Sequence, residues 1–412
     1  MVGCINKGFC RHSPPDEWQL LSGLWPPWKK QARGLEIIAT RPAASGGETL
    51  IAATNTPNQF YYVILIINTI YMKTKISTRK LVLIAIGLVS IGALSAYKYS
   101  PAKNVPVKFK QIMGADISFI PQLEAEGRKF NDNGVSKDPF TILKDHGFNY
   151  VRLRIFNNPK ADSGYSAKGY CGLEDTKKMA LRIKEAGMGF LLDFHYSDTW
   201  ADPGKQYKPA AWKKLNNQQL QDSIKAFTRL TLLALKKQGT LPDMVQVGNE
   251  INHGILWPDG RLKNLDTLAG FLKAGISGVR EVSGNIRIML HIACGGQNAE
   301  SIYFVDNMLK RGVNFDIIGE SYYPEWHGTP DSLKNNLTSL TTRYKQDVMV
   351  AEYSQHKREV NDIAFSLPGN KVKGTFIWEP FSWGETFVDK QGNTNAHMAT
   401  YDSIKNQYHI SQ

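Results

Sequence analysis

The sequence predicts an α/β protein: a single (β/α)8 (TIM) barrel domain with an N-terminal signal or anchor segment. Short apolar runs alternate with helix-like segments from about residue 109 to the C-terminus. Eight such runs occur over about 300 residues, which is the size and rhythm of this barrel. Polar residues follow the ends of these runs, where parallel barrels carry their chemistry.

Composition narrows the function classes. The chain has 412 residues, 42% of them hydrophobic, and a formal net charge of +13. Lys and Arg are spread along the chain without interleaved aromatic blocks, so we expect no nucleic-acid partner. Aromatic residues make up 11% and include nine Trp. This content suits a protein that packs sugar rings against aromatic planes.

The N-terminal part divides into two segments. Residues 1–71 have no sustained period and read as a poorly structured extension, upstream of the natural start at Met72 in our hypothesis. The basic stretch Met72–Lys80 and the apolar stretch 81–96 have the layout of a secretory signal, and 72–108 would be this signal plus a linker. We therefore expect a secreted, periplasmic or cell-surface protein. The alternative is an uncleaved signal-anchor, which would be its only membrane contact.

The barrel itself is expected over residues 109–412. Its eight strands are predicted at 113–118, 150–156, 189–195, 245–250, 286–291, 315–321, 348–352 and 374–379. Helical periodicity is clear in 173–186, 217–237 and 265–282. A doubly wound sheet is the runner-up, but it would need a glycine-rich phosphate turn after an early strand, and the sequence has none.

Two glutamates stand at the ends of two apolar runs. Met244–Ile251 delivers Asn249 and Glu250, and Asp347–Tyr353 delivers Glu352. In a barrel roughly 15 Å across, strand ends three places apart are about 14 Å apart, so the two carboxyls would lie about 5 to 6 Å from each other. This spacing favours a retaining glycoside hydrolase, in which one carboxylate attacks the sugar and the other is acid and base.

Neighbouring residues divide the roles. Asn249 could hold the sugar 2-hydroxyl while Glu250 acts as acid and then base. Glu352 would be the nucleophile, kept ionised by donors such as Arg154, His195 or Tyr322. The expected substrate-binding residues are Asp116, Arg152, Arg154, His195, Trp200, Asn249, Tyr322, Trp326 and Trp378.

Structural readings stay open beside these roles. Arg152 and Arg154 could serve only to pair with barrel carboxylates, His195 could be a satisfied core histidine, and each Trp could be packing. His291 has no assigned role. Glu320, Glu325, Glu379 and Glu385 are reserve candidates for the carboxylate roles.

Cysteine usage gives no metal motif. Cys171 and Cys294 are far apart in sequence and fit no metal-ligand spacing. Both would follow barrel strands, so a bridge is conceivable, but two unpaired thiols are the favoured reading.

Several motifs of the sequence resemble those of glycoside hydrolase family 53, the endo-β-1,4-galactanases. They are Gly114–Ser118, Val151–Arg154, Leu192–Pro203, Val245–Glu250, Ser321–Pro324 and Val350–Glu352. The resemblance implies hydrolysis of β-1,4-galactosidic bonds in galactan or type I arabinogalactan, with Glu250 as acid/base and Glu352 as nucleophile. The acidic calcium loop of some members is lacking after Glu352, so we expect no metal and no cofactor. The expected partner is the polysaccharide alone, bound by a monomer.

Two other functions compete with this one. A related hydrolase of the same clan would cut mannan or β-glucan, and a catalytically silent barrel would only bind carbohydrate. Retention of both Glu250 and Glu352 argues against the silent barrel.

Overall fold

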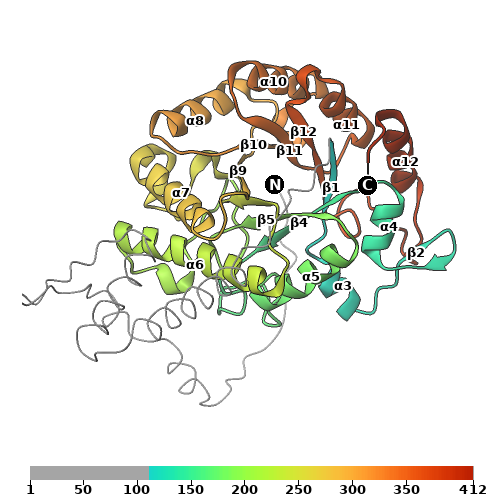
Figure 1. Ribbon diagram of the computed structural model, residues 1–412, viewed down its shortest axis with the longest axis horizontal. Coiled ribbons are helices and arrows are strands. Elements are labelled where there is room, and N and C mark those ends of the chain that lie inside the picture. The colour runs from blue at the N-terminus through green and yellow to red at the C-terminus, as the bar shows by residue number, and fades with distance from the viewer. Residues whose placement is uncertain (1–110, 412) are drawn as a thin grey trace, which may run out of the picture. The chain divides into compact units, whose positions relative to one another are not determined.

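The computed structural model describes residues 111–411, which form the predicted closed barrel (Figure 1). Its strands neighbour one another in the order β1-β12-β11-β10-β9-β6-β5-β4, all in parallel pairs. Because the first and last strands pair, the doubly wound alternative is wrong. The strands are β1 (Ile112–Asp116), β4 (Tyr150–Ile155), β5 (Gly189–Phe194), β6 (Met244–Val247), β9 (Arg287–Ile292), β10 (Ile317–Tyr322), β11 (Asp347–Tyr353) and β12 (Val372–Trp378).

Helices surround these strands (Figure 1). They are α4 (Pro139–Asp145), α5 (Leu173–Glu185), α6 (Asn217–Gln238), α7 (Leu265–Arg280), α8 (Asn298–Lys310), α10 (Pro330–Arg343), α11 (Lys357–Ser366) and α12 (Ala396–Tyr408). Local chemistry sets their ends. Helix α6 begins at a capping box, in which the side chains of Asn216 and Gln219 each accept from the other's backbone N–H, and it stops at Gly239 in the left-handed conformation.

Short elements lie in the connections. They are α3 (Ile120–Ala125), α9 (Pro324–His327), the hairpins β2 (Asn131–Asp132) with β3 (Val135–Ser136) and β7 (Gly254–Ile255) with β8 (Gly260–Arg261), and the 3-10 turns η2 (Ala210–Trp212), η3 (Ile251–His253), η4 (Leu262–Asn264) and η5 (Pro368–Asn370).

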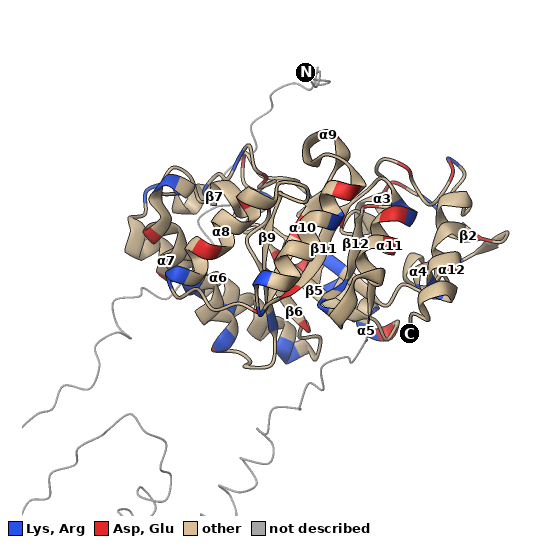
Figure 2. Cartoon of the chain, turned by 90° about the horizontal axis from the view of Figure 1, so that it is seen from above, with Lys and Arg blue, Asp and Glu red and all other residues tan. Residues whose placement is uncertain are grey.

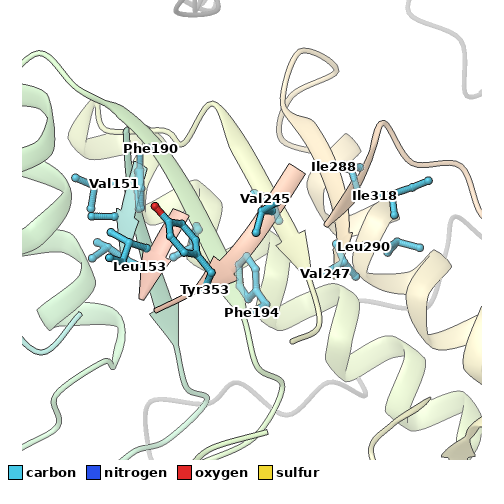
Figure 3. Close-up of a cluster of buried hydrophobic side chains, with 14 of the residues drawn as sticks. Val151, Leu153, Phe190, Phe194, Val245, Val247, Ile288, Leu290, Ile318 and Tyr353 are labelled. Atoms are coloured by element: carbon cyan, nitrogen blue, oxygen red, sulfur yellow. The ribbon is translucent and has the colours of Figure 1, made fainter. Parts of the chain in front are cut away.

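The core has two apolar layers, because successive strand residues point to opposite faces. The outer layer packs the strands against the helices, and Figure 3 shows part of it around Val151, Leu153, Val245 and Leu290. The inner layer fills the barrel with Ile112, Tyr150, Leu191, Met244, Met289, Ile317, Met349, Ala351 and Phe376. This inner layer is the floor of the site.

The polar residues above that floor follow from the same alternation. Arg152, Gln246 and His291 each lie two positions beyond an inner-layer residue of their own strand, so they point into the barrel as well. All three are fully or almost fully buried. The barrel interior therefore changes from apolar to polar toward the strand ends.

Two strand ends depart from regular geometry. Strand β6 stops at Val247, so the predicted extension of this strand to Glu250 is wrong. Gly248 and Glu250 have φ of 89° and 49°, and Glu250 precedes η3. In β11 the register slips, so that Glu320 pairs with Val350 while Ser321 pairs with Glu352. Such a bulge re-aims the side chain that follows it.

The predicted extension at 1–71 and the signal or anchor with its linker at 72–108 lie outside the described residues. Within 111–411, no helix is long and apolar enough to cross a membrane. Cys171 and Cys294 are both buried free thiols, as favoured from the sequence. Lys and Arg are interspersed with Asp and Glu over many elements of the barrel in the view of Figure 2.

Candidate active site

A cavity of about 1080 Å³ lies at the C-terminal ends of the barrel strands. Residues from the loops after β1, β4, β5, β6, β9, β10, β11 and β12 line it. Both Glu250 and Glu352 are among them. The lining also carries seven aromatic residues, Phe119, Tyr165, Trp200, Tyr323, Trp326, Trp378 and Trp383.

The two glutamates face each other. Each presents a carboxylate oxygen within 4.8 Å of the other and of a ring nitrogen of His291. Glu250 and Glu352 are 9% and 8% exposed, so water is largely excluded from both. This closeness agrees with the expected separation of about 5 to 6 Å and with the retaining arrangement, whose carboxyls are about 5–5.5 Å apart.

Arg152 organises the floor of the cavity with all five of its N–H groups. Its Nη1 donates to Glu352 Oε2 at 2.9 Å and to Asp116 Oδ2 at 3.0 Å. Its Nη2 donates to Asp193 Oδ2 at 2.9 Å and to Asn249 Oδ1 at 2.8 Å. Its Nε donates to a glutamine, Gln246, at 3.2 Å. Arg152 thus holds Glu352 and orients the amide beside Glu250.

Tyr323 supplies the second donor to Glu352. Its hydroxyl lies 2.7 Å from Glu352 Oε1. The sequence-based choice of Tyr322 is wrong, because the Tyr322 hydroxyl donates to the carbonyl of Gly328 and this side chain does not line the cavity. Arg154 and His195 are not donors to Glu352 either. His195 contacts Asp193 through Nε2 at 3.1 Å and accepts from the backbone of Ala201.

Glu250 has a different environment. Its Oε1 accepts from the Ser321 hydroxyl at 2.7 Å. Burial, together with the negative charge of Glu352, raises the pKa of Glu250 to about 8. Burial also raises the pKa of Glu352, but the Arg152 guanidinium and the Tyr323 hydroxyl oppose this rise. Of the two carboxyl groups, Glu250 therefore carries the proton and Glu352 is ionised.

Arg154 lies in an aromatic box beside the pair. Its guanidinium is 4.4 Å from the ring centres of both Phe119 and Trp200. Its Nη1 donates to Glu379 Oε1 and Asp116 Oδ1, while its Nε and Nη2 are buried without a partner. Arg154 supports the aromatic wall through these contacts and leaves three N–H groups, one on Nε and two on Nη2, free beside the cavity.

The nine predicted substrate-binding residues fall into two groups. Those that line the cavity are Arg152, Arg154, His195, Trp200, Asn249, Trp326 and Trp378. Asp116 and Tyr322 do not line it. Asp116 is buried behind the wall, bonded to both arginines and to Ser118, so its predicted direct contact with substrate is wrong and it acts through those arginines.

The four reserve glutamates differ in their location and in their partners. Glu325 lines the cavity, and Glu379 pairs with Arg154. Glu320 points outward, where it accepts from Ser301 of α8 and Asn336 of α10. Glu385 pairs with Lys357.

Sequence reasoning missed several cavity residues, namely Phe119, Tyr165, Gln297, Tyr323 and Trp383. All follow predicted strands, so position along the chain was the available signal. It could not separate Tyr323 from its neighbour Tyr322.

Within residues 111–411, the nearest approach to a metal-ligand cluster is Glu250, His291 and Glu352. Both ring nitrogens of His291 already lie at hydrogen-bond distance from protein atoms of Ser321, Gln246 and Asn249. The chemistry available here is that of two carboxyls with different proton affinities.

A closed parallel barrel with paired carboxyls at its strand tips defines the class, the (β/α)8 glycoside hydrolases. The chain belongs to glycosyl hydrolase family 53, whose family model matches residues 112–365.

Known proteins agree with this assignment. The chain is 38% identical over 248 residues to an endo-beta-1,4-galactanase of Bacillus subtilis (strain 168), covering 59% of this chain and 56% of that protein. It is 36% identical over 252 residues to an arabinogalactan endo-beta-1,4-galactanase of Cellvibrio japonicus (strain Ueda107), covering 58% and 64%. The chain thus spans less than two thirds of these curated relatives. The solved GH53 catalytic domain of Ignisphaera aggregans is 33% identical with a TM-score of 0.66, covering 73% of this chain and 98% of that domain.

Proposed function

We propose that this protein hydrolyses internal β-1,4-galactosidic bonds of galactan with retention of configuration. The observation that carries the proposal is the pair of facing carboxyls, of which Glu352 is held ionised by Arg152 and Tyr323 while Glu250 keeps a proton. The two relatives described above, both named as galactanases, support the choice of galactan.

The chemistry runs in two displacements. Glu352 attacks the anomeric carbon while Glu250 gives its proton to the leaving glycosidic oxygen, which forms a glycosyl ester on Glu352. Glu250, now ionised, takes a proton from a water molecule as that water attacks the same carbon. The sugar leaves with its configuration retained, and both carboxyls return to their starting state.

Asn249 is suited to hold the sugar 2-hydroxyl. Its Oδ1 is occupied by Arg152, and one amide hydrogen goes to the Ala201 carbonyl at 2.9 Å. The second amide hydrogen remains for a substrate oxygen. The aromatic residues of the cavity wall offer planes against which further sugar rings of the chain can pack.

Two glutamate variants test the proposal. Glu352→Ala should abolish turnover of galactan, and azide should restore turnover of an activated aryl galactoside with formation of a glycosyl azide. Glu250→Gln should lower kcat/KM on galactan by roughly 10²–10⁴-fold. The exposed Glu281 provides a control, because Glu281→Gln should leave both rates unchanged.

Substrate comparison separates the alternatives. The wild type should cleave galactan in preference to mannan and carboxymethyl-cellulose. Activity on the last two alone would transfer the assignment to another substrate of the clan. Binding of galactan without turnover would identify a silent carbohydrate-binding barrel.

We further propose export through the segment at 72–96, on the strength of its basic and apolar stretches. N-terminal sequencing of the exported protein should find the mature end at or after Ser90. A mature end well before that residue would contradict a cleaved signal.

A further inference from the structure

His291 on β9 is buried completely and has no part in the chemistry proposed above. Its Nε2 lies 2.8 Å from the Ser321 hydroxyl oxygen. That hydroxyl in turn lies 2.7 Å from Glu250 Oε1. On its other side, His291 Nδ1 lies 3.0 Å from Gln246 Nε2 and 3.0 Å from Asn249 Oδ1. A continuous path of short contacts therefore runs from inside the barrel to Glu250.

Arg152 determines which way the amide of Gln246 faces. The guanidinium can only donate, so its Nε–H binds the amide oxygen of Gln246 at 3.2 Å. The Gln246 amide nitrogen must then face the opposite way. One of its hydrogens goes to Asp193 Oδ1 at 2.6 Å. The other has three acceptors within reach, His291 Nδ1 at 3.0 Å, Asn249 Oδ1 at 3.1 Å and the Gly248 carbonyl at 3.2 Å, of which His291 Nδ1 is the nearest.

The ring of His291 is neutral. Complete burial and the nearby positive charge of Arg152 both lower its pKa well below the ordinary histidine value. A neutral imidazole has one N–H, and its other nitrogen is an acceptor. Nδ1 is the nearest acceptor for the second amide hydrogen of Gln246, and Asn249 Oδ1 already accepts from Arg152 at 2.8 Å. The proton of His291 therefore belongs on Nε2, directed at Ser321.

Ser321 completes the sequence of donors. When its oxygen accepts from His291 Nε2–H, its own hydrogen is free to bind Glu250 Oε1. An oxygen that accepts this bond is a poor place for the carboxyl proton. Among residues 111–411, Glu250 Oε2 has no hydrogen-bond partner, and this oxygen is left to carry the acidic proton.

We propose that His291 and Ser321 are positioning residues for the acid/base, an inference that rests on the role proposed for Glu250. Hydrogen bonds all point one way, from Arg152 to Gln246, His291, Ser321 and finally Glu250. This series of hydrogen bonds keeps the proton of Glu250 on Oε2, where it can be given to the leaving oxygen. No proton moves along the chain: after Oε2 has given up its proton, Ser321 still donates to Oε1 and stabilises the carboxylate.

Arg152 thereby acts on the carboxyl groups of both Glu352 and Glu250. Arg152 binds Glu352 directly through Nη1 and orients Glu250 through the chain that starts at its Nε. The alternative tautomer of His291 reverses the last two bonds. Ser321 would then donate to His291, and Glu250 would have to keep its proton on Oε1, turned away from the substrate.

The tautomer can be read directly. The full chain, labelled with ¹⁵N-histidine, should show His291 by NMR as a neutral ring with its proton on Nε2, assigned as the signal lost in His291→Gln. A neutral ring with its proton on Nδ1, or a charged ring, would overturn the proposal. This measurement does not depend on activity. It can contradict the tautomer of His291 while the proposed function holds, and it can support the tautomer while the proposed function is wrong.

Kinetics give a second, independent readout. In Ser321→Ala the proton of Glu250 is free to occupy Oε1, so kcat/KM on galactan should fall by about tenfold or more, the worth of one hydrogen bond to a carboxyl. A dinitrophenyl galactoside needs no acid for its leaving group, and its kcat/KM should change by less than about threefold, well below the worth of that bond. An equal loss on both substrates would indicate a structural role for Ser321 and contradict the proposal.

Ser301→Ala is the matched control. The Ser301 hydroxyl also donates to a buried glutamate, Glu320, at the same distance of 2.7 Å, but this pair does not line the cavity. The variant should lower the thermal midpoint and leave the ratio of the two kcat/KM values unchanged. Ser321→Thr, which keeps a hydroxyl, should recover activity on galactan relative to Ser321→Ala.

Discussion

At the scale of single residues, two adjacent tyrosines show how finely the site depends on strand geometry. Tyr322 closes β10 and turns its hydroxyl to the Gly328 carbonyl, whereas Tyr323 places its own 2.7 Å from Glu352 Oε1. Sequence identifies a pair of tyrosines after a strand but not which of them enters the barrel. That choice depends on where β10 ends and the next turn begins.

We expect Tyr323→Phe to weaken Glu352, the proposed nucleophile. The variant keeps the ring but loses one of the two donors to Glu352, and hydrogen bonds to charged groups contribute about 1.5–3 kcal/mol. kcat/KM on galactan should fall by roughly 10- to 100-fold. Because the hydroxyl lowers the pKa of Glu352, the acidic limb of the pH profile should also move to higher pH.

The neighbouring Tyr322→Phe is the control for this prediction. It loses a hydroxyl bonded to the backbone and should affect stability only, leaving the pH profile of kcat/KM in place. A shift of the acidic limb in Tyr322→Phe, or none in Tyr323→Phe, would contradict the assignment of donors.

At the scale of elements, the strand ends that carry Glu250 and Glu352 are both irregular, and each irregularity orients a glutamate. The bulge in β11 brings Glu352 opposite Ser321, and the turn after β6 holds Glu250 at a positive φ. Sequence period predicted the strands, but it could not predict the bulge, because Val348–Ala351 is an unbroken apolar run up to Glu352. The same alternation explains why Glu320, one residue before Ser321, points outward to α8 and α10.

Gly248→Ala tests the turn that follows β6. Gly248 has φ of 89°, and an added Cβ would lie 2.6 Å from Ile251 Cγ2. The strain costs about 1–3 kcal/mol and is relieved by displacing the next residues, which are Asn249 and Glu250. We expect a lower thermal midpoint together with a fall in kcat on galactan.

Gly239→Ala separates the two effects. Gly239 also has positive φ, at the C-terminus of α6, but its added Cβ would meet only the flexible end of Lys184 at 3.3 Å. This variant should lose about 1 kcal/mol of stability while kcat is unchanged. Equal kcat losses in both variants would show that the turn does not position Glu250.

At the scale of the whole molecule, the sequence was sufficient for the barrel and for its two facing glutamates. Strand rhythm and polar strand tips are repeated eight times, so errors of one to three residues at single ends do not change the topology. The supporting contacts made by Arg152, Tyr323 and Ser321 join residues 29 to 200 positions apart in sequence. Such contacts depend on the closed barrel and cannot be inferred from local patterns.

The burial that raises the pKa of Glu250 should also lower the stability of the protein as pH rises. The pKa values of Glu250 and Glu320 are raised from 4.5 to about 8 in the folded protein, chiefly by burial. Between these pH values the folded chain binds more protons than the unfolded chain, so the free energy of unfolding falls as pH increases.

Glu250→Gln removes one of these titrations. Its thermal midpoint relative to wild type should therefore rise between pH 4.5 and about pH 8. A constant difference for Glu250→Gln would mean that its carboxyl titrates alike in the folded and unfolded chain, and a carboxyl of that kind could not hold the catalytic proton near neutral pH.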